Sequence, residues 1–82
     1  MTSQVLIVDD EKDMTRFLKK NLELDMDCSV TMAFSARMAI EILEKSEFDL
    51  MLCDIRMPGM DGFEPLEYTR EHYPELTVLM LT

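Results

Sequence analysis

Short apolar runs alternate along this chain with longer stretches in which apolar and charged residues recur at helical spacing. Residues 5–8 form a continuous apolar run that ends in two acids, a pattern typical of a strand buried on both faces of a parallel sheet. Residues 11–24 predict an amphipathic helix, which either Asp9 or Asp10 would cap. The predicted apolar face of this helix consists of Met14, Phe17, Leu18 and Leu22.

The same alternation continues to the end of the sequence. Further strands are predicted over residues 28–34, 48–53 and 76–81, and further helices over residues 36–45 and 63–73. Ser35 is the predicted N-cap of the second helix, and Pro74 is the predicted stop of the third. The apolar faces of these two helices are predicted to be Ala36, Ala39, Ile40 and Leu43, and Phe63, Leu66, Arg70 (through its aliphatic stem) and Tyr73.

Strands and helices that alternate in this way require parallel neighbouring strands joined by right-handed crossovers. The sequence therefore predicts one doubly wound α/β domain with a parallel sheet over residues 1–82. Composition agrees with this prediction, because 48% of the residues are hydrophobic, which is too many for a disordered acidic segment. A chain of 82 residues is also too short for a second domain.

The net charge of −9 bears on the choice of partners. Nucleic acid and anionic membrane surfaces repel so acidic a domain, and we expect it to bind neither. Cys28 and Cys53 have no zinc-binding spacing, and we expect them to be reduced, buried thiols of a cytoplasmic protein. The sequence shows no stretch typical of a signal peptide or a membrane span, so we expect neither.

Oxygen-bearing side chains stand at the predicted carboxyl ends of three strands. Asp9 and Asp10 follow the first strand, Asp54 follows the third, and Thr82 follows the fourth. Ligands of open parallel sheets bind at these ends, so the three carboxylates would share one cleft if the first and third strands are neighbours. Carboxylates so close together repel one another unless one is protonated or a cation lies among them, and an incomplete shell of hard oxygens suits Mg²⁺. One carboxylate would then be available as a nucleophile, because carboxylates form aspartyl-phosphates.

Taken singly, each of these residues has a more ordinary explanation. Asp9 and Asp10 would serve as a helix cap, and Asp54 would form a turn before the Pro58-Gly59 loop. Thr82 alone carries no signal. Only their coincidence at the ends of neighbouring strands indicates a site.

Three motifs resemble the receiver domain of two-component response regulators: V-L-I-V-D-D at 5–10, L-C-D-I-R-M-P-G-M-D-G at 52–62 and V-L-M-L-T at 78–82. The resemblance implies a flavodoxin-like fold with strand order 2-1-3-4-5. It implies that Asp54 accepts a phosphoryl group from a histidine kinase. It also implies a Mg²⁺ site in which Asp10 is the direct ligand and Asp9 acts through water, with Asp54 and the backbone carbonyl of Arg56 also contributing. Thr82 would be the hydroxyl that switches onto the phosphoryl group, and Pro58 and Gly59 would shape the adjoining loop.

The resemblance also implies parts that the 82 residues do not contain: a fourth helix, a fifth strand with its aromatic switch residue, a lysine after that strand, and a fifth helix. We therefore expect a receiver truncated after its fourth strand, with an output domain in the parent protein. Residues Val78 to Leu81 would then lack covering elements on both faces of an edge strand. We therefore expect homo-oligomerisation, either strand to strand through residues 77–81 or by a swapped element.

Two other functions compete with a phosphoacceptor signalling module that is not an enzyme. One is an Asp-nucleophile phosphatase or phosphotransferase, but such enzymes typically carry D-x-D after the first strand, where this chain has D-D-E-K-D. The other is an assembly module with a vestigial acidic cleft. Turnover of a phosphate ester would favour the first, and a defined oligomer without Mg²⁺ binding would favour the second.

Overall fold

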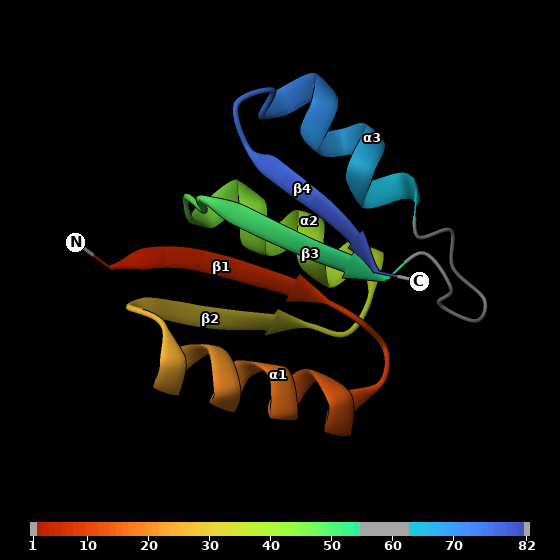
Figure 1. The fold of residues 1–82 in the computed structure, drawn as a ribbon. Coiled ribbons are helices and arrows are strands. Elements are labelled where there is room, and N and C mark those ends of the chain that lie inside the picture. The colour runs from red at the N-terminus through yellow and green to blue at the C-terminus, as the bar shows by residue number, and fades with distance from the viewer. Residues whose placement is uncertain (1, 55–62, 82) are drawn as a thin grey trace.

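The computed structural model describes residues 2–54 and 63–81 and contains a four-stranded sheet with helices on both faces (Figure 1). All three strand pairs are parallel, and the strand order is β2-β1-β3-β4. The predicted α/β class and strand order are therefore confirmed. Every predicted element is present within two residues of its expected bounds: β1 (Ser3–Val8), α1 (Lys12–Asp25), β2 (Cys28–Ala33), α2 (Ala36–Lys45), β3 (Leu50–Asp54), α3 (Phe63–His72) and β4 (Thr77–Leu81).

The central strand β1 is buried on both faces, as its unbroken apolar run predicts. Leu6 and Val8 pack in the cluster that includes Ala39 and Leu43 of α2, whereas Ile7 packs on the opposite face. Successive side chains of a strand point to opposite faces, so one strand supplies both cores. Figure 1 shows the result, with α1 on one side of the sheet and α2 and α3 on the other.

Helix α1 does not use the apolar face that its spacing predicts. Leu18 and Leu22 pack against the sheet, but Met14 and Phe17 are 51% and 64% exposed. The fully buried residue of α1 is instead Thr15. The prediction is wrong at Met14 and Phe17 because the helix is rotated so that the Thr15 side faces the sheet.

The predicted cap of α1 is also wrong. The N-cap is Glu11, whose side chain makes no capping hydrogen bond, and the Asp9 carboxylate instead accepts a hydrogen bond from the Glu11 N–H. The predicted cap of α2 is confirmed, since the Ser35 hydroxyl accepts a hydrogen bond from the Met38 N–H at 3.1 Å.

The predicted face of α2 is confirmed at Ala36, Ala39 and Leu43, which are buried, while Ile40 is half-buried. The prediction for α3 is wrong at Arg70, which is exposed, because Pro65 and Thr69 occupy the buried side of this helix. Phe63 lies in a part of α3 whose side chains the structure does not describe.

Strand β4 is one edge of the sheet, as expected, but only one of its faces is open. Val78 and Met80 pack against the core under α2 and α3, so the expectation that both faces lack cover is wrong at these two residues. Leu79, on the opposite face, is 52% exposed. Within the described ranges, no helix has the length and apolar character needed to cross a membrane.

Candidate metal and phosphoryl site

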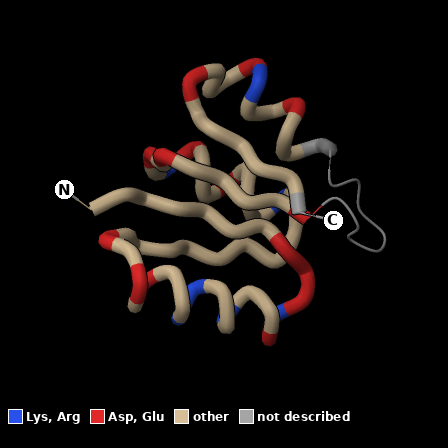
Figure 2. Tube along the Cα trace, viewed as in Figure 1, with Lys and Arg blue, Asp and Glu red and all other residues tan. Residues whose placement is uncertain are grey.

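Three carboxylates meet at the carboxyl ends of the central strands. Asp9 and Asp10 directly follow β1, and Asp54 is the last residue of β3. Since β1 and β3 are paired in parallel up to Val8 and Cys53, the residues that follow this pair lie side by side. One carboxylate oxygen from each acid lies within 4.8 Å of the other two, and Figure 2 shows the acidic segment that follows β1.

Asp9 is the most enclosed member of this cluster, with only 5% of its surface exposed. Its N–H donates to the carbonyl of Ala33 at 3.0 Å, and its carboxylate accepts from the N–H of Glu11 at 2.9 Å. Burial raises the pKa of Asp9; the hydrogen bond from Glu11 lowers it, and the neighbouring Asp54 and Asp10 raise it again. Carboxylates this close cannot all remain charged without cost unless a cation offsets their repulsion.

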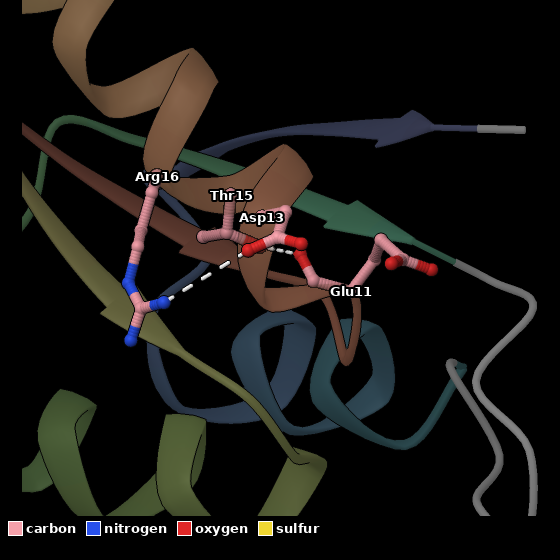
Figure 3. A network of polar contacts seen from close by, with 4 residues as sticks. All are labelled: Glu11, Asp13, Thr15 and Arg16. Atoms are coloured by element: carbon pink, nitrogen blue, oxygen red, sulfur yellow. Dashed lines mark hydrogen bonds and ion pairs between the residues drawn. The ribbon is translucent and has the colours of Figure 1, made fainter.

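Hydrogen bonds at both the N–H and the carbonyl of Glu11 stabilise the turn between β1 and α1. Besides the Asp9 contact at its N–H, Glu11 accepts a hydrogen bond at its carbonyl from the buried Thr15 hydroxyl at 2.7 Å (Figure 3). Asp13 and Arg16 form a looser, exposed ion pair at 4.0 Å on the outside of the same turn. Thr15 therefore helps to position Asp9, a role that the predicted apolar stripe of this helix did not reveal.

Cys53 lies beside the cluster without joining it. Burial, together with the charges of Asp54 and Asp9, raises the pKa of its thiol to about 11. The thiol therefore stays protonated at neutral pH and does not supply a thiolate ligand. Cys28 and Cys53 form no disulfide with each other. Cys53 is buried as predicted, whereas Cys28 is only half-buried.

The donor set suits a hard divalent cation. Carboxylate oxygens are ligands that Mg²⁺ prefers, and opposite oxygens of its octahedral shell lie about 4.2 Å apart. The oxygens of Asp9, Asp10 and Asp54 are gathered within a similar distance, 4.8 Å. Because Asp10 is exposed, the cluster is open on one side to water and to a phosphoryl group.

The other predicted site residues lie outside the described part of the chain. These residues are Arg56, Pro58, Gly59 and Thr82. Their predicted roles stay predictions.

Residues 5–82 match the family model of the response regulator receiver domain. The chain belongs to this family. A similar curated relative is the response regulator protein FleR of Pseudomonas aeruginosa, which is 37% identical over 82 residues. That match covers 100% of the chain but only 17% of FleR, so the chain corresponds to a small part of that relative.

Solved receiver structures show the same arrangement of strands and helices. A CheY-like receiver domain protein from Methanospirillum hungatei superposes with a TM-score of 0.91 at 31% identity, over 98% of the chain and 63% of that structure. The non-phosphorylated HemR receiver domain from Leptospira biflexa gives a TM-score of 0.90 at 30% identity, over 99% of the chain and 64% of that structure. TrrA from Thermotoga maritima, solved in complex with Mg²⁺-BeF, gives a TM-score of 0.83 at 25% identity, over 96% of the chain and 66% of that structure.

Proposed function

We propose that this receiver domain accepts a phosphoryl group on Asp54 from a phosphohistidine of a histidine kinase. The observation that carries the proposal is the gathering of three carboxylate oxygens within 4.8 Å at the end of β1 and β3. Asp10, Asp54 and the backbone carbonyl of Arg56 would hold Mg²⁺ there, with Asp9 contributing through water. The TrrA complex with Mg²⁺-BeF supports the choice of metal. When bound, Mg²⁺ neutralises the oxygens of the transferring group.

The transfer is a displacement at phosphorus. An Asp54 carboxylate oxygen forms the new P–O bond, and the P–N bond of the phosphohistidine breaks. The imidazole takes the bonding electron pair and leaves as a neutral ring after protonation. Asp54 is half-buried and lies beside the buried Asp9, so the acceptor residue is partly accessible from outside the protein. The Thr82 hydroxyl then donates a hydrogen bond to the phosphoryl group. Its movement alters one surface of the domain, which changes an interaction with an output domain.

Four further parts of this proposal concern the protein as a whole. Residues 1–82 form a receiver that is incomplete relative to its family, and its function is regulatory rather than enzymatic. Cys28 and Cys53 form no disulfide with each other, which supports a location in the reducing cytoplasm. The exposed Leu79 on the β4 edge supports homo-oligomerisation.

The proposal is tested with beryllofluoride and Mg²⁺, which together mimic an aspartyl-phosphate, and with acetyl phosphate as a small phosphoryl donor. We expect a new bound ¹⁹F resonance and, with acetyl phosphate, a mass increase of one phosphoryl group. Asp54→Asn should abolish both signals. Asp25→Asn, an exposed acid at the far end of α1, should leave both unchanged. Signals that persist in Asp54→Asn, or that are absent from the protein, would overturn the proposal.

A further inference from the structure

A concave site lies at the opposite end of the sheet from the acidic cluster. It is a groove of about 770 Å³ formed where α2 turns into β3 and where α3 turns into β4. Figure 1 shows both turns at the amino-terminal ends of β3 and β4, away from the carboxyl ends where the acidic cluster lies. Asp9, Asp10 and Asp54 do not line it, so the groove is independent of the proposed phosphoryl site.

The floor of the groove is aromatic and fixed in place. Phe48 and Tyr73 are half-buried and pack against the core cluster beneath them. The Tyr73 hydroxyl donates to the carbonyl of Leu43 at 2.9 Å, which holds the ring across the end of α2. A ring held in this way offers a preformed contact surface at little cost in side-chain entropy.

The rim of the groove is negative. Glu44, Glu47, Asp49 and Glu75 line it, against the two basic side chains Lys45 and His72. The Asp49 carboxylate is fixed by the N–H of Gln4, which donates to it at 2.7 Å. Helices α2 and α3 both end here, at Lys45 and His72, and helix C-termini add partial negative charge. The electrostatic potential of the groove therefore favours a cation.

Aromatic rings beside carboxylates suit one kind of cation especially well. The planar guanidinium of arginine stacks on an aromatic face while its N–H groups donate to carboxylates. A single ammonium ion would leave most of the 770 Å³ and the apolar floor unused. Nucleic acid and anionic lipid are repelled by the rim and by the net charge of −9.

We propose that this groove binds a basic segment of a protein partner, with an arginine among the rim carboxylates and an adjacent apolar side chain on the floor of Phe48 and Tyr73. The groove thus provides a docking surface at the end of the domain remote from phosphoryl chemistry. The rim carboxylates attract the cation, and the aromatic rings beside them favour the planar guanidinium of arginine over an ammonium group. The rest of the aromatic floor favours the apolar neighbour.

The experiment uses a fluorescein-labelled nonapeptide of alternating arginine and leucine, titrated with the protein at low salt and followed by fluorescence anisotropy. The charge-matched probe alternates arginine and serine. We expect saturable binding of the first peptide and at least tenfold weaker binding of the second. Backbone NMR shifts should map to Ser46, Asp49 and Leu76, and not to α1. Spermidine should compete poorly, since it lacks an apolar side chain.

Glu47→Lys with Glu75→Lys reverses two exposed rim charges and should weaken binding at least tenfold. Asp25→Lys with Glu67→Lys changes the net charge equally at exposed positions outside the groove and should have an effect of less than twofold. Asp54→Asn should bind the arginine–leucine peptide with unchanged affinity, so the test of the groove does not depend on the proposed phosphoryl site. Equal losses in the two double variants, equal affinity for the two peptides, or no binding would overturn the proposal; circular dichroism establishes that each variant is folded.

Discussion

Asp9 experiences the strongest electrostatic conflict among the site residues. It is almost fully buried, and its carboxylate shares a small volume with those of Asp10 and Asp54. Burial and these two neighbours raise its pKa, so the folded protein without metal binds a proton at Asp9 more tightly than the unfolded chain does. The same carboxylate supports the turn into α1 through Glu11, a contact that an amide oxygen can also make.

The first prediction concerns the pH dependence of stability in metal-free buffer. A raised folded-state pKa contributes stability below the unfolded value near 3.8, and this contribution is lost as the pH rises through the folded-state pKa. The stability due to Asp9 should therefore increase as the pH falls from about 7 to about 4. Asp9→Asn should remove this component and stabilise the protein at neutral pH by about 1 kcal/mol, or about 4–8 °C in Tm.

Thermal melts across this pH range measure both effects. Asp13→Asn, at an exposed position on α1, is the control and should keep the wild-type pH profile. A variant Asp9→Asn that melts below wild type at neutral pH without Mg²⁺ would contradict the proposed repulsion. Adding Mg²⁺ should reverse the order, because the ion stabilises only the protein that retains its ligands.

At the scale of single elements, the two helices that flank β2 differ in how their orientation is specified. Helix α2 carries Ser35 as an N-cap and buries small residues on its predicted side. Helix α1 has apolar residues on more than one side, and its burial is decided by Thr15, Leu18 and Leu22. Apolar spacing alone therefore identifies the face of α2 but only part of that of α1, where Leu18 and Leu22 are predicted correctly and Met14 and Phe17 are not.

The cap of α2 should make a measurable contribution to stability. Ser35→Ala removes the acceptor for the Met38 N–H and should cost about 1 kcal/mol. Ser46→Ala is the matched control, because at the C-terminal end of α2 the backbone N–H of Ser46, not its hydroxyl, makes the capping bond to Ile42. Urea denaturation followed by circular dichroism measures the free energy of unfolding of both variants. Equal losses of stability in Ser35→Ala and Ser46→Ala would show that the hydroxyl of Ser35 contributes nothing specific.

The exposed side of α1 should tolerate polar substitution. Phe17→Gln should change the free energy of unfolding by no more than about 0.5 kcal/mol, since the ring is 64% exposed. Leu22→Ala, on the side packed against Val5 and Ile7, should cost about 2 kcal/mol. Denaturant unfolding compares the two variants, and a larger cost for Phe17→Gln would mean that the predicted apolar face was right after all.

At the scale of the whole molecule, the two edges of the sheet differ. On the β2 edge, the Glu23 carboxylate of α1 accepts a hydrogen bond from the Val30 N–H at 2.8 Å, which covers part of that strand. On the β4 edge, Leu79 is 52% exposed. Charged groups protect edge strands against pairing with other chains, and exposed apolar ones do not.

We therefore expect any self-association of these 82 residues to proceed through β4. Leu79→Lys should lower the apparent mass toward that of a monomer, as measured by light scattering at micromolar concentration. Leu24→Lys is the control, since Leu24 is 73% exposed on α1, away from this edge. A monomeric wild type, or an equal effect of both variants, would count against association at the β4 edge.

The sequence by itself determined the order of the elements, the parallel sheet and the gathering of Asp9, Asp10 and Asp54. The first two follow from local patterns, because an unbroken apolar run identifies a buried strand and the acids that follow it must stand at its carboxyl end. The gathering also requires β1 and β3 to be neighbours, which the motifs imply only through their resemblance to receiver domains. Tertiary structure alone decided the rotation of α1, the role of Thr15 and the distant groove around Tyr73. These features depend on contacts between segments far apart along the chain, and hydrophobic spacing within a single helix does not encode which neighbour its faces will meet.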